Sequence, residues 1–236
     1  MKQHAAEQQS TCQSESCITA QLAEQLLVAQ TDVCHDSCGL LQIGARWGGT
    51  DFGGSENFPE LKSSVREAMA SGNTATYCET GFNLGQSAQV ALLSNPHVMV
   101  HAFDMGVGRA PAAAAACLNA TFGERLRMHW GDSTIAVPAA PRGLHCNVIL
   151  IDGGHEDGVP QKDLANFRRL AAPGAFVIMD DVFCNMEHCM EPSTAWSSAI
   201  ASGWLLQTSV RTRNNTNAHD PSNPVWGVVS GHYRPE

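Results

Sequence analysis

The sequence has no continuous apolar run of about 18 residues, the length that a helix needs to cross a bilayer. Residues Met1–Ser16 are polar and lack the apolar core of a secretory signal. No basic run occurs either, because the 14 lysine and arginine residues are scattered along a chain of net charge −9. These absences predict a cytoplasmic protein that binds no membrane and no nucleic acid, and whose partner is a small-molecule substrate.

Aromatic residues make up only 6% of the chain, which gives no sign of a broad stacking surface for a large ligand. Charged residues contribute 16% and hydrophobic residues 43%, both ordinary for a globular protein. At 236 residues the chain is long enough to bury one large core. This composition is compatible with a homo-oligomer but does not require one.

Paired CxxC spacing, the usual sign of a zinc site, is also missing. The two segments that come nearest to such a site are Cys34–Cys38 and Cys184–Cys189, each of which contains a histidine. The nine cysteines are an odd number, and they are dispersed along a chain too long to need disulfide bonds for stability. We therefore expect most of them to be reduced thiols, as in cytosolic proteins.

From Ala75 onward the sequence alternates between short apolar segments and helical segments. This alternation predicts an α/β fold with a doubly wound, mostly parallel, seven-stranded sheet. The expected strands are Ala75–Glu79, Val98–Asp104, Leu126–Trp130, Cys146–Asp152, Ala175–Asp181, Trp204–Arg213 and Val225–His232. The expected helices are about Leu84–Ser94, Pro111–Phe122, Pro160–Ala172 and Thr194–Ser202. The last two strands are joined by a short polar loop, so we expect an antiparallel last strand.

Residues 1–74 precede this pattern and form a separate segment. Four-residue spacing of apolar side chains predicts an amphipathic helix over Cys17–Gln30, and a second helix follows Asn57. The glycine-rich stretch Trp47–Gly54 either closes over a site or is a surface loop. We expect residues 1–74 to be a helical or lid segment packed on a cofactor-binding core formed by residues 75–236.

One stretch, Thr76–Ala88, has the pattern of a ligand-binding turn. A short strand ends in an acid and runs through a glycine turn into a helix of small residues. Glycines let the backbone approach a ligand closely, and the free amides of a helix start point toward it. The candidate cofactor-binding residues of this stretch are Glu79, Gly81, Asn83, Gly85 and Ser87.

Acidic residues stand at or just after the carboxyl ends of the predicted strands. They are Glu79, Asp104, Asp132, Asp152, Asp180 and Asp181. A single acid in such a place is as readily a turn or helix cap. A whole set at one edge favours a site, because ligands of open α/β sheets bind beyond the carboxyl ends of the strands.

Asp104 lies about 20 residues after the glycine turn, where an acid can bind both hydroxyls of a ribose. The same position would serve NAD. A dinucleotide site, however, requires the pattern GxGxxG, and the turn Gly81–Gly85 has Phe82 in its middle and no third glycine. A nucleoside ligand without phosphates therefore fits better.

These residues resemble a known family, the class I S-adenosylmethionine-dependent methyltransferases. The segment Glu79–Ala88 (ETGFNLGQSA) is similar to their motif I. Asp104 resembles the acid that binds the ribose, and Gly131-Asp132-Ser133 resembles the segment beside the adenine. The resemblance covers roughly residues 75–182 and implies S-adenosyl-L-methionine as cofactor and a Rossmann-like methyltransferase fold.

Later motifs resemble a subgroup, the small-molecule O-methyltransferases of the macrocin type, which depend on a metal. They are Ile151–His155 (IDGGH), Asp163-Leu164, Pro173-Gly174-Ala175 and Asp180-Asp181. The resemblance implies that Asp152, Asp180 and Asp181 bind Mg²⁺, and that Asp152 also belongs to the cofactor site and to catalysis. His155 is the candidate general base. Some relatives use an acid at the position of Gly154, so either His155 or the metal alone activates the hydroxyl.

Two other functions fit parts of the sequence. One is a metal-independent N- or C-methyltransferase of the same fold. The other is a nucleotide-fold dehydrogenase or a non-catalytic binding protein, which the missing GxGxxG and the set of acids disfavour. The acceptor substrate is not encoded in a readable motif, because it depends on the loops Trp47–Phe58, Phe183–Pro192 and Asn214–Pro224.

Overall fold

The computed structural model describes residues 75–214 and 224–235. The expected N-terminal segment, with its two helices and its glycine-rich stretch, lies outside the described residues, as does most of the loop Asn214–Pro224. Within the described part of the chain, no helix is both long enough and apolar enough to cross a membrane.

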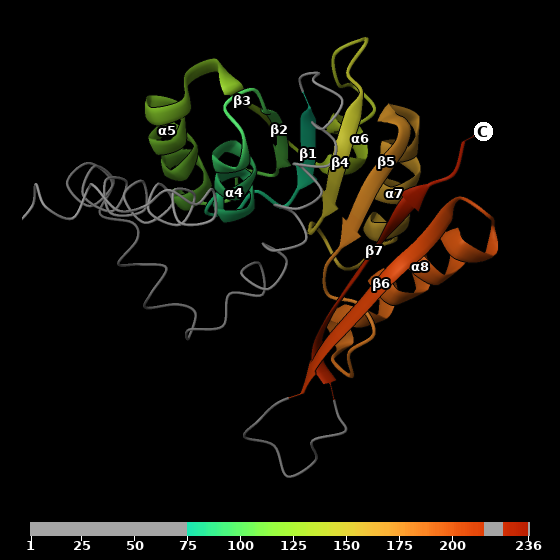
Figure 1. The fold of residues 1–236 in the computed structure, drawn as a ribbon. Coiled ribbons are helices and arrows are strands. Elements are labelled where there is room, and N and C mark those ends of the chain that lie inside the picture. The colour runs from blue at the N-terminus through green and yellow to red at the C-terminus, as the bar shows by residue number, and fades with distance from the viewer. Residues whose placement is uncertain (1–74, 215–223, 236) are drawn as a thin grey trace, which may run out of the picture. The chain divides into compact units, whose positions relative to one another are not determined.

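The sheet has seven strands in the order β3-β2-β1-β4-β5-β7-β6. Their bounds are β1 (Thr76–Thr80), β2 (Met99–Asp104), β3 (Leu126–Trp130), β4 (Cys146–Ile151), β5 (Ala171–Met179), β6 (Leu205–Asn214) and β7 (Pro224–Tyr233). The strands β1 to β5 are parallel, whereas β7 runs antiparallel to both β5 and β6. Figure 1 shows β6 and β7 as a long pair beside β5. This topology confirms the predicted doubly wound α/β sheet.

Helices cover both faces of the sheet (Figure 1). Their bounds are α4 (Gln86–Ser94), α5 (Ala110–Phe122), α6 (Ser133–Ala136), α7 (Val159–Leu170) and α8 (Met190–Ala201), with the short 3-10 turns η2 (Gly123–Arg125) and η3 (Glu187–Cys189). One core packs α4 and α5 against side chains such as Tyr77 and Val100. The other packs α7 and α8 against Phe103, Ile149 and their neighbours. Alternate strand residues thus fill two cores, which is why the central strands read as continuous apolar runs.

The turn between α7 and β5 differs from the expectation. The sequence predicts a helix that extends to Ala172 and stops at Pro173-Gly174, but α7 ends at Leu170 and these two residues lie inside β5. The pairing of β4 with β5 shifts register between Cys146 and Val148, opposite this part of β5. Gly174 has a φ of +74°, which is not a strand conformation. The strand therefore accommodates Pro173 and Gly174 where its regular pairing with β4 is interrupted.

The expectation of reduced thiols is wrong for the described cysteines. Cys78 of β1 forms a disulfide with Cys146 of β4, and Cys184 forms one with Cys189. Cys117 is also disulfide-bonded. The spacing argument missed the first pair because its members lie 68 residues apart and meet only through the pairing of β1 with β4. Five oxidised cysteines are a feature of proteins from oxidising compartments and are at odds with the expected cytoplasmic location.

Candidate active site

The glycine turn after β1 is packed so tightly that its first residue must be glycine. Gly81 has a φ of +84°, and a Cβ placed on it would lie 1.6 Å from the carbonyl oxygen of Asp152. Its amide donates a hydrogen bond to the carbonyl oxygen of Phe103 at 3.0 Å. The turn is therefore packed between the ends of β2 and β4.

The carboxylate of Asp104, at the end of β2, organises the loops on either side of it. Its Oδ2 accepts a hydrogen bond from the Asn83 amide at 2.9 Å, and its Oδ1 accepts one from the Gly106 amide at 2.7 Å. Asn83 has a positive φ of 47°, a conformation that asparagine tolerates better than most residues. Each carboxylate oxygen keeps a second lone pair, so Asp104 can still accept hydrogen bonds from two ligand hydroxyls.

Glu79 lies beneath the turn, fully buried. Its Oε2 accepts hydrogen bonds from the Tyr77 hydroxyl at 2.6 Å and from the Ser87 hydroxyl at 2.5 Å. Burial raises the pKa of Glu79 to about 7, although both hydroxyls act in the opposite direction. Glu79 and Ser87 therefore join the end of β1 to the start of α4.

A cavity of about 360 Å³ opens beyond the carboxyl ends of β1, β2 and β4. Its volume falls in the range of small-molecule sites. The cavity is lined by Thr80, Gly81, Asn83, Phe103, Asp104, Met105, Val107, Pro111, Gly131, Asp132, Ser133, Asp152, Gly153, Gly154 and Val159. Six of the predicted cofactor residues are in this lining: Gly81, Asn83, Asp104, Asp132, Ser133 and Asp152. The other three do not line it: Gly85 ends the turn, and Glu79 and Ser87 are joined by a hydrogen bond beneath it.

The far side of the cavity is built on the start of α6. The Asp132 carboxylate caps this helix by accepting hydrogen bonds from the amide and the hydroxyl of Thr134, which lower its pKa. The Ser133 hydroxyl donates to Asp163 Oδ2 at 3.1 Å. Asp163 belongs to α7, is fully buried, and has a pKa raised to about 6 by burial. This buried carboxylate holds a wall of the cavity without lining it.

A second group of side chains adjoins the cavity through Asp152, which belongs to both. One ligand atom from each of Asp152, His155 and Asp181 lies within 4.8 Å of the others. His155 Nε2 is 3.1 Å from Asp181 Oδ2. The contact with Asp181 raises the pKa of His155, and burial acts against it. We call these three residues the acid–imidazole cluster.

Asp181 is the centre of the cluster. Its Oδ2 faces His155, and its Oδ1 lies 3.5 Å from Nε2 of His188. Its φ of +52° is uncommon outside glycine, and turns of this kind concentrate at functional sites. Its amide donates to Oδ1 of the neighbouring Asp180, which is buried. Among the described residues Asp180 is not part of the three-residue group, whereas His155 is.

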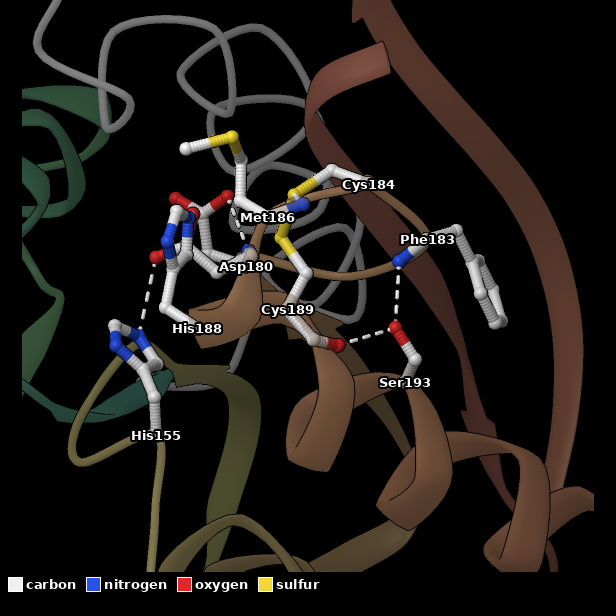
Figure 2. Close-up of a disulfide and its surroundings, with 9 residues drawn as sticks. His155, Asp180, Phe183, Cys184, Met186, His188, Cys189 and Ser193 are labelled. Atoms are coloured by element: carbon white, nitrogen blue, oxygen red, sulfur yellow. Dashed lines mark hydrogen bonds and ion pairs between the residues drawn. A yellow bond between two sulfur atoms is a disulfide. The ribbon is translucent and has the colours of Figure 1, made fainter. Parts of the chain in front are cut away.

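His188 reaches the cluster from a loop that a disulfide closes (Figure 2). The bond joins Cys184 to Cys189, which directly follows His188. Ser193 of α8 fixes both ends of the loop, since its hydroxyl donates to the carbonyl of Cys189 at 2.5 Å and accepts from the Phe183 amide at 2.7 Å. The loop is thus tied to α8 at two points.

Negative charge is concentrated at the cluster. Burial, followed by the charges of Asp180, Asp181 and Glu79, raises the pKa of Asp152 well above its usual value. A bound cation would relieve this repulsion, and the donor atoms are close enough together to share one. The carboxylates of Asp152 and Asp181 and the His155 imidazole therefore fit a divalent cation.

Comparison with known proteins agrees with this geometry. Residues 78–182 match the family model described as a methyltransferase domain. Over residues 78–182 the chain therefore carries a methyltransferase domain. The match covers the glycine turn, the lining of the cavity and the acid–imidazole cluster. No curated protein sequence matches the chain significantly.

Solved structures resemble the methyltransferase domain in fold. The structure of a candidate O-methyltransferase from Klebsiella pneumoniae is 14% identical in sequence, with a TM-score of 0.65 over 87% of this chain and 90% of the other. An O-methyltransferase from Bacillus cereus, solved with SAH, is 13% identical, with a TM-score of 0.63 over 86% and 90%. TomG from Streptomyces achromogenes, an O-methyltransferase of tomaymycin synthesis solved with SAM, is 15% identical, with a TM-score of 0.56 over 74% and 80%. At these identities the likeness establishes the fold alone, and N-methyltransferases share it.

Two residues of the methyltransferase domain were not predicted to have a role at the site. Asp163 appeared only within a motif, and its position on the buried face of α7 is the signal that could have identified it. His188 had no such signal, because its approach to Asp181 depends on the disulfide-closed loop.

Proposed function

We propose that the chain transfers a methyl group from S-adenosylmethionine to a hydroxyl group of a small molecule. The observation that carries this proposal is the position of Asp152, which lines the cofactor cavity and also belongs to the acid–imidazole cluster. A methyl donor in the cavity would therefore lie beside groups that can hold and deprotonate an acceptor.

The cavity suits the nucleoside part of the cofactor. Asp104 offers carboxylate oxygens for ribose hydroxyls, while Ser133 and the adjoining wall flank the place where the adenine would lie. Since the glycine turn lacks the pattern that packs against a pyrophosphate, a sulfonium nucleoside fits it better than a dinucleotide. The SAH and SAM complexes of the similar structures support the same cofactor.

The reaction needs little from the protein beyond alignment and removal of one proton. The acceptor oxygen forms a bond to the methyl carbon, the bond from that carbon to sulfur breaks, and S-adenosylhomocysteine leaves. The hydroxyl proton has to go to a base. Without an ion in the cluster, the His155 imidazole can accept it, and the Asp181 carboxylate, 3.1 Å from the buried Nε2, stabilises the resulting imidazolium.

A divalent cation at the cluster would lower the pKa of a bound hydroxyl and so supply the same activation. Asp152, Asp181 and His155 would hold it. The structural similarity to TomG, an O-methyltransferase of tomaymycin synthesis, supports a small-molecule acceptor. The loop Phe183–Ser193 borders the cluster and is the described segment best placed to contact that acceptor.

The decisive experiment is a calorimetric titration with S-adenosylmethionine and with NAD, followed by methyl-transfer assays on hydroxylated acceptors with and without a chelator. We expect S-adenosylmethionine to bind and NAD not to bind. Asp181→Ala should retain cofactor binding, because this residue lies outside the cavity lining, and should lose turnover. Glu124→Ala, which removes an exposed acid in η2 outside the site, serves as the control and should keep both.

Absence of S-adenosylmethionine binding would overturn the proposed cofactor. Methylation of amines but not hydroxyls, unaffected by chelation, would replace the proposal by a metal-independent N-methyltransferase.

A further inference from the structure

The donor atoms at the acid–imidazole cluster do not match the magnesium ion that the sequence resemblance implies. Mg²⁺ takes oxygen ligands and retains several waters, and an all-carboxylate set of Asp152, Asp180 and Asp181 would suit it. In the structure the grouped donors are two carboxylates and one imidazole, because the third member of the group is His155 and not Asp180.

The side chain of Asp180 takes part in a turn of the backbone. Its side chain is buried and its Oδ1 accepts the hydrogen bond of the Asp181 amide at 2.9 Å. This bond belongs to the turn in which Asp181 has its positive φ of 52°. Asp180 therefore shapes the turn that presents Asp181, and it is Asp181 that projects toward the histidines.

His155 has the arrangement of a ligand. Its Nε2 is buried and, among the described residues, makes no hydrogen bond of good geometry, although Asp181 Oδ2 is only 3.1 Å away. A ring nitrogen placed beside two carboxylates without a well-aligned hydrogen bond is suited to a common metal centre. Imidazole nitrogens favour transition ions over the alkaline earths.

His188 supports this group from the other side. Its Nε2 lies 3.5 Å from Asp181 Oδ1, so the two oxygens of Asp181 face different histidines. A carboxylate ligand whose second oxygen is held by a neighbouring group keeps a fixed orientation. The Cys184–Cys189 bond and Ser193 hold the loop that delivers His188 (Figure 2).

We propose that Asp152, His155 and Asp181 bind a divalent transition ion of the Mn²⁺, Fe²⁺, Co²⁺ and Zn²⁺ class in preference to Mg²⁺, and that His188 is a positioning residue for Asp181. The proposal rests on the proposed function only for the use of the ion in methyl transfer. With three protein ligands and a partly exposed mouth, open coordination positions remain for an acceptor.

The test uses the full chain, freed of metal by a chelator and dialysed, with Co²⁺ as a spectroscopic probe. We expect one Co²⁺ per chain, with visible absorption bands typical of nitrogen and oxygen ligands. Mg²⁺ should displace Co²⁺ only at about 100-fold or greater excess, because the imidazole discriminates between them. Displacement by Mg²⁺ at equal concentration would overturn the proposal.

Variants assign the roles. His155→Ala should change the Co²⁺ spectrum and weaken binding at least about 10-fold, because a ligand is lost. His188→Ala should keep the shape of the spectrum and weaken binding about 10-fold, because it acts through Asp181. His145→Ala removes an exposed histidine and should alter neither. An unchanged spectrum and affinity in His155→Ala would refute the ligand assignment.

S-adenosylmethionine binding to each variant, measured by calorimetry without metal, reports whether the variant is folded and tests the proposed function separately. Cofactor binding with no Co²⁺ signature refutes this inference and leaves the methyltransferase proposal intact. A Co²⁺ signature without cofactor binding supports the metal site and refutes the methyltransferase proposal.

Discussion

The backbone amide of Asn83 donates a hydrogen bond to Asp104 Oδ2 at 2.9 Å, which fixes the glycine turn after β1 to the end of β2. The same carboxylate holds the Gly106 amide on the other side. The residue that we propose to bind a ribose thus also shapes the loops on either side of it.

We predict that Asp104→Ala weakens S-adenosylmethionine binding about 10- to 100-fold, which is the effect of losing hydrogen bonds to a charged group. Calorimetric titration measures it. Glu156→Ala removes the same charge from an exposed position and should bind as the wild type does. Equal affinity in Asp104→Ala would show that this acid is not part of the cofactor site.

Gly81 and Gly108 provide a matched pair for the glycine turn, since their φ angles are +84° and +83°. A Cβ on Gly81 meets the backbone of Asp152, whereas one on Gly108 meets nothing within 4 Å. Gly108→Ala should therefore reduce the free energy of unfolding by about 1 kcal/mol, the conformational cost alone. Gly81→Ala adds a collision with backbone and should cost about 3 kcal/mol or more. Urea unfolding compares the two, and equal losses would contradict the packing at Gly81.

Asp163 should make the stability of the protein depend on pH in a defined direction. Its pKa is raised from 3.8 to about 6, so the folded protein binds this proton more tightly than the unfolded chain does. The contribution of Asp163 to stability is therefore greatest below pH 3.8 and is lost as pH rises to about 6, by up to about 3 kcal/mol. The cause is the burial of the carboxylate, which outweighs the hydrogen bond from Ser133 and the charge of Lys162.

Asp163→Asn should remove this loss, so that its free energy of unfolding exceeds that of the wild type more at pH 7 than at pH 4. Asp157→Asn, an exposed change of the same kind on the loop before α7, is the control and should follow the wild-type pH profile. Parallel profiles for Asp163→Asn and wild type would mean that Asp163 does not titrate in this range.

The two disulfides should differ in their effect on stability. The Cys78–Cys146 bond closes a loop of 68 residues, whereas the Cys184–Cys189 bond spans only 5. Loop-closure entropy predicts a loss of about 4 kcal/mol for Cys78→Ser/Cys146→Ser and about 2 kcal/mol for Cys184→Ser/Cys189→Ser. Unfolding by urea without reductant measures both losses. A larger loss for the short loop would show that local packing outweighs chain entropy.

The sequence predicted the sheet well because its central strands are buried on both faces and read as apolar runs ending in acids, as in Cys146–Ile151. It also predicted that Asp104 lies beside the glycine turn. Both stand at the carboxyl ends of neighbouring parallel strands, β2 and β1, and so meet at the same edge of the sheet. It could not rank Asp180 against His155 as members of the cluster, because that depends on the positive φ of Asp181. His188 and the paired cysteines were also beyond reach, since their partners are set by tertiary contacts rather than by local spacing.

The disulfide between β1 and β4 encloses residues 79–145, the part of the chain that contains α4, β2, α5, β3 and α6. A single cut by a protease anywhere in that part leaves both pieces joined through Cys78 and Cys146. On a denaturing gel the nicked protein would migrate as one intact chain until a thiol is added, and only then would two fragments separate. A preparation judged whole without reductant can therefore already be broken within residues 79–145.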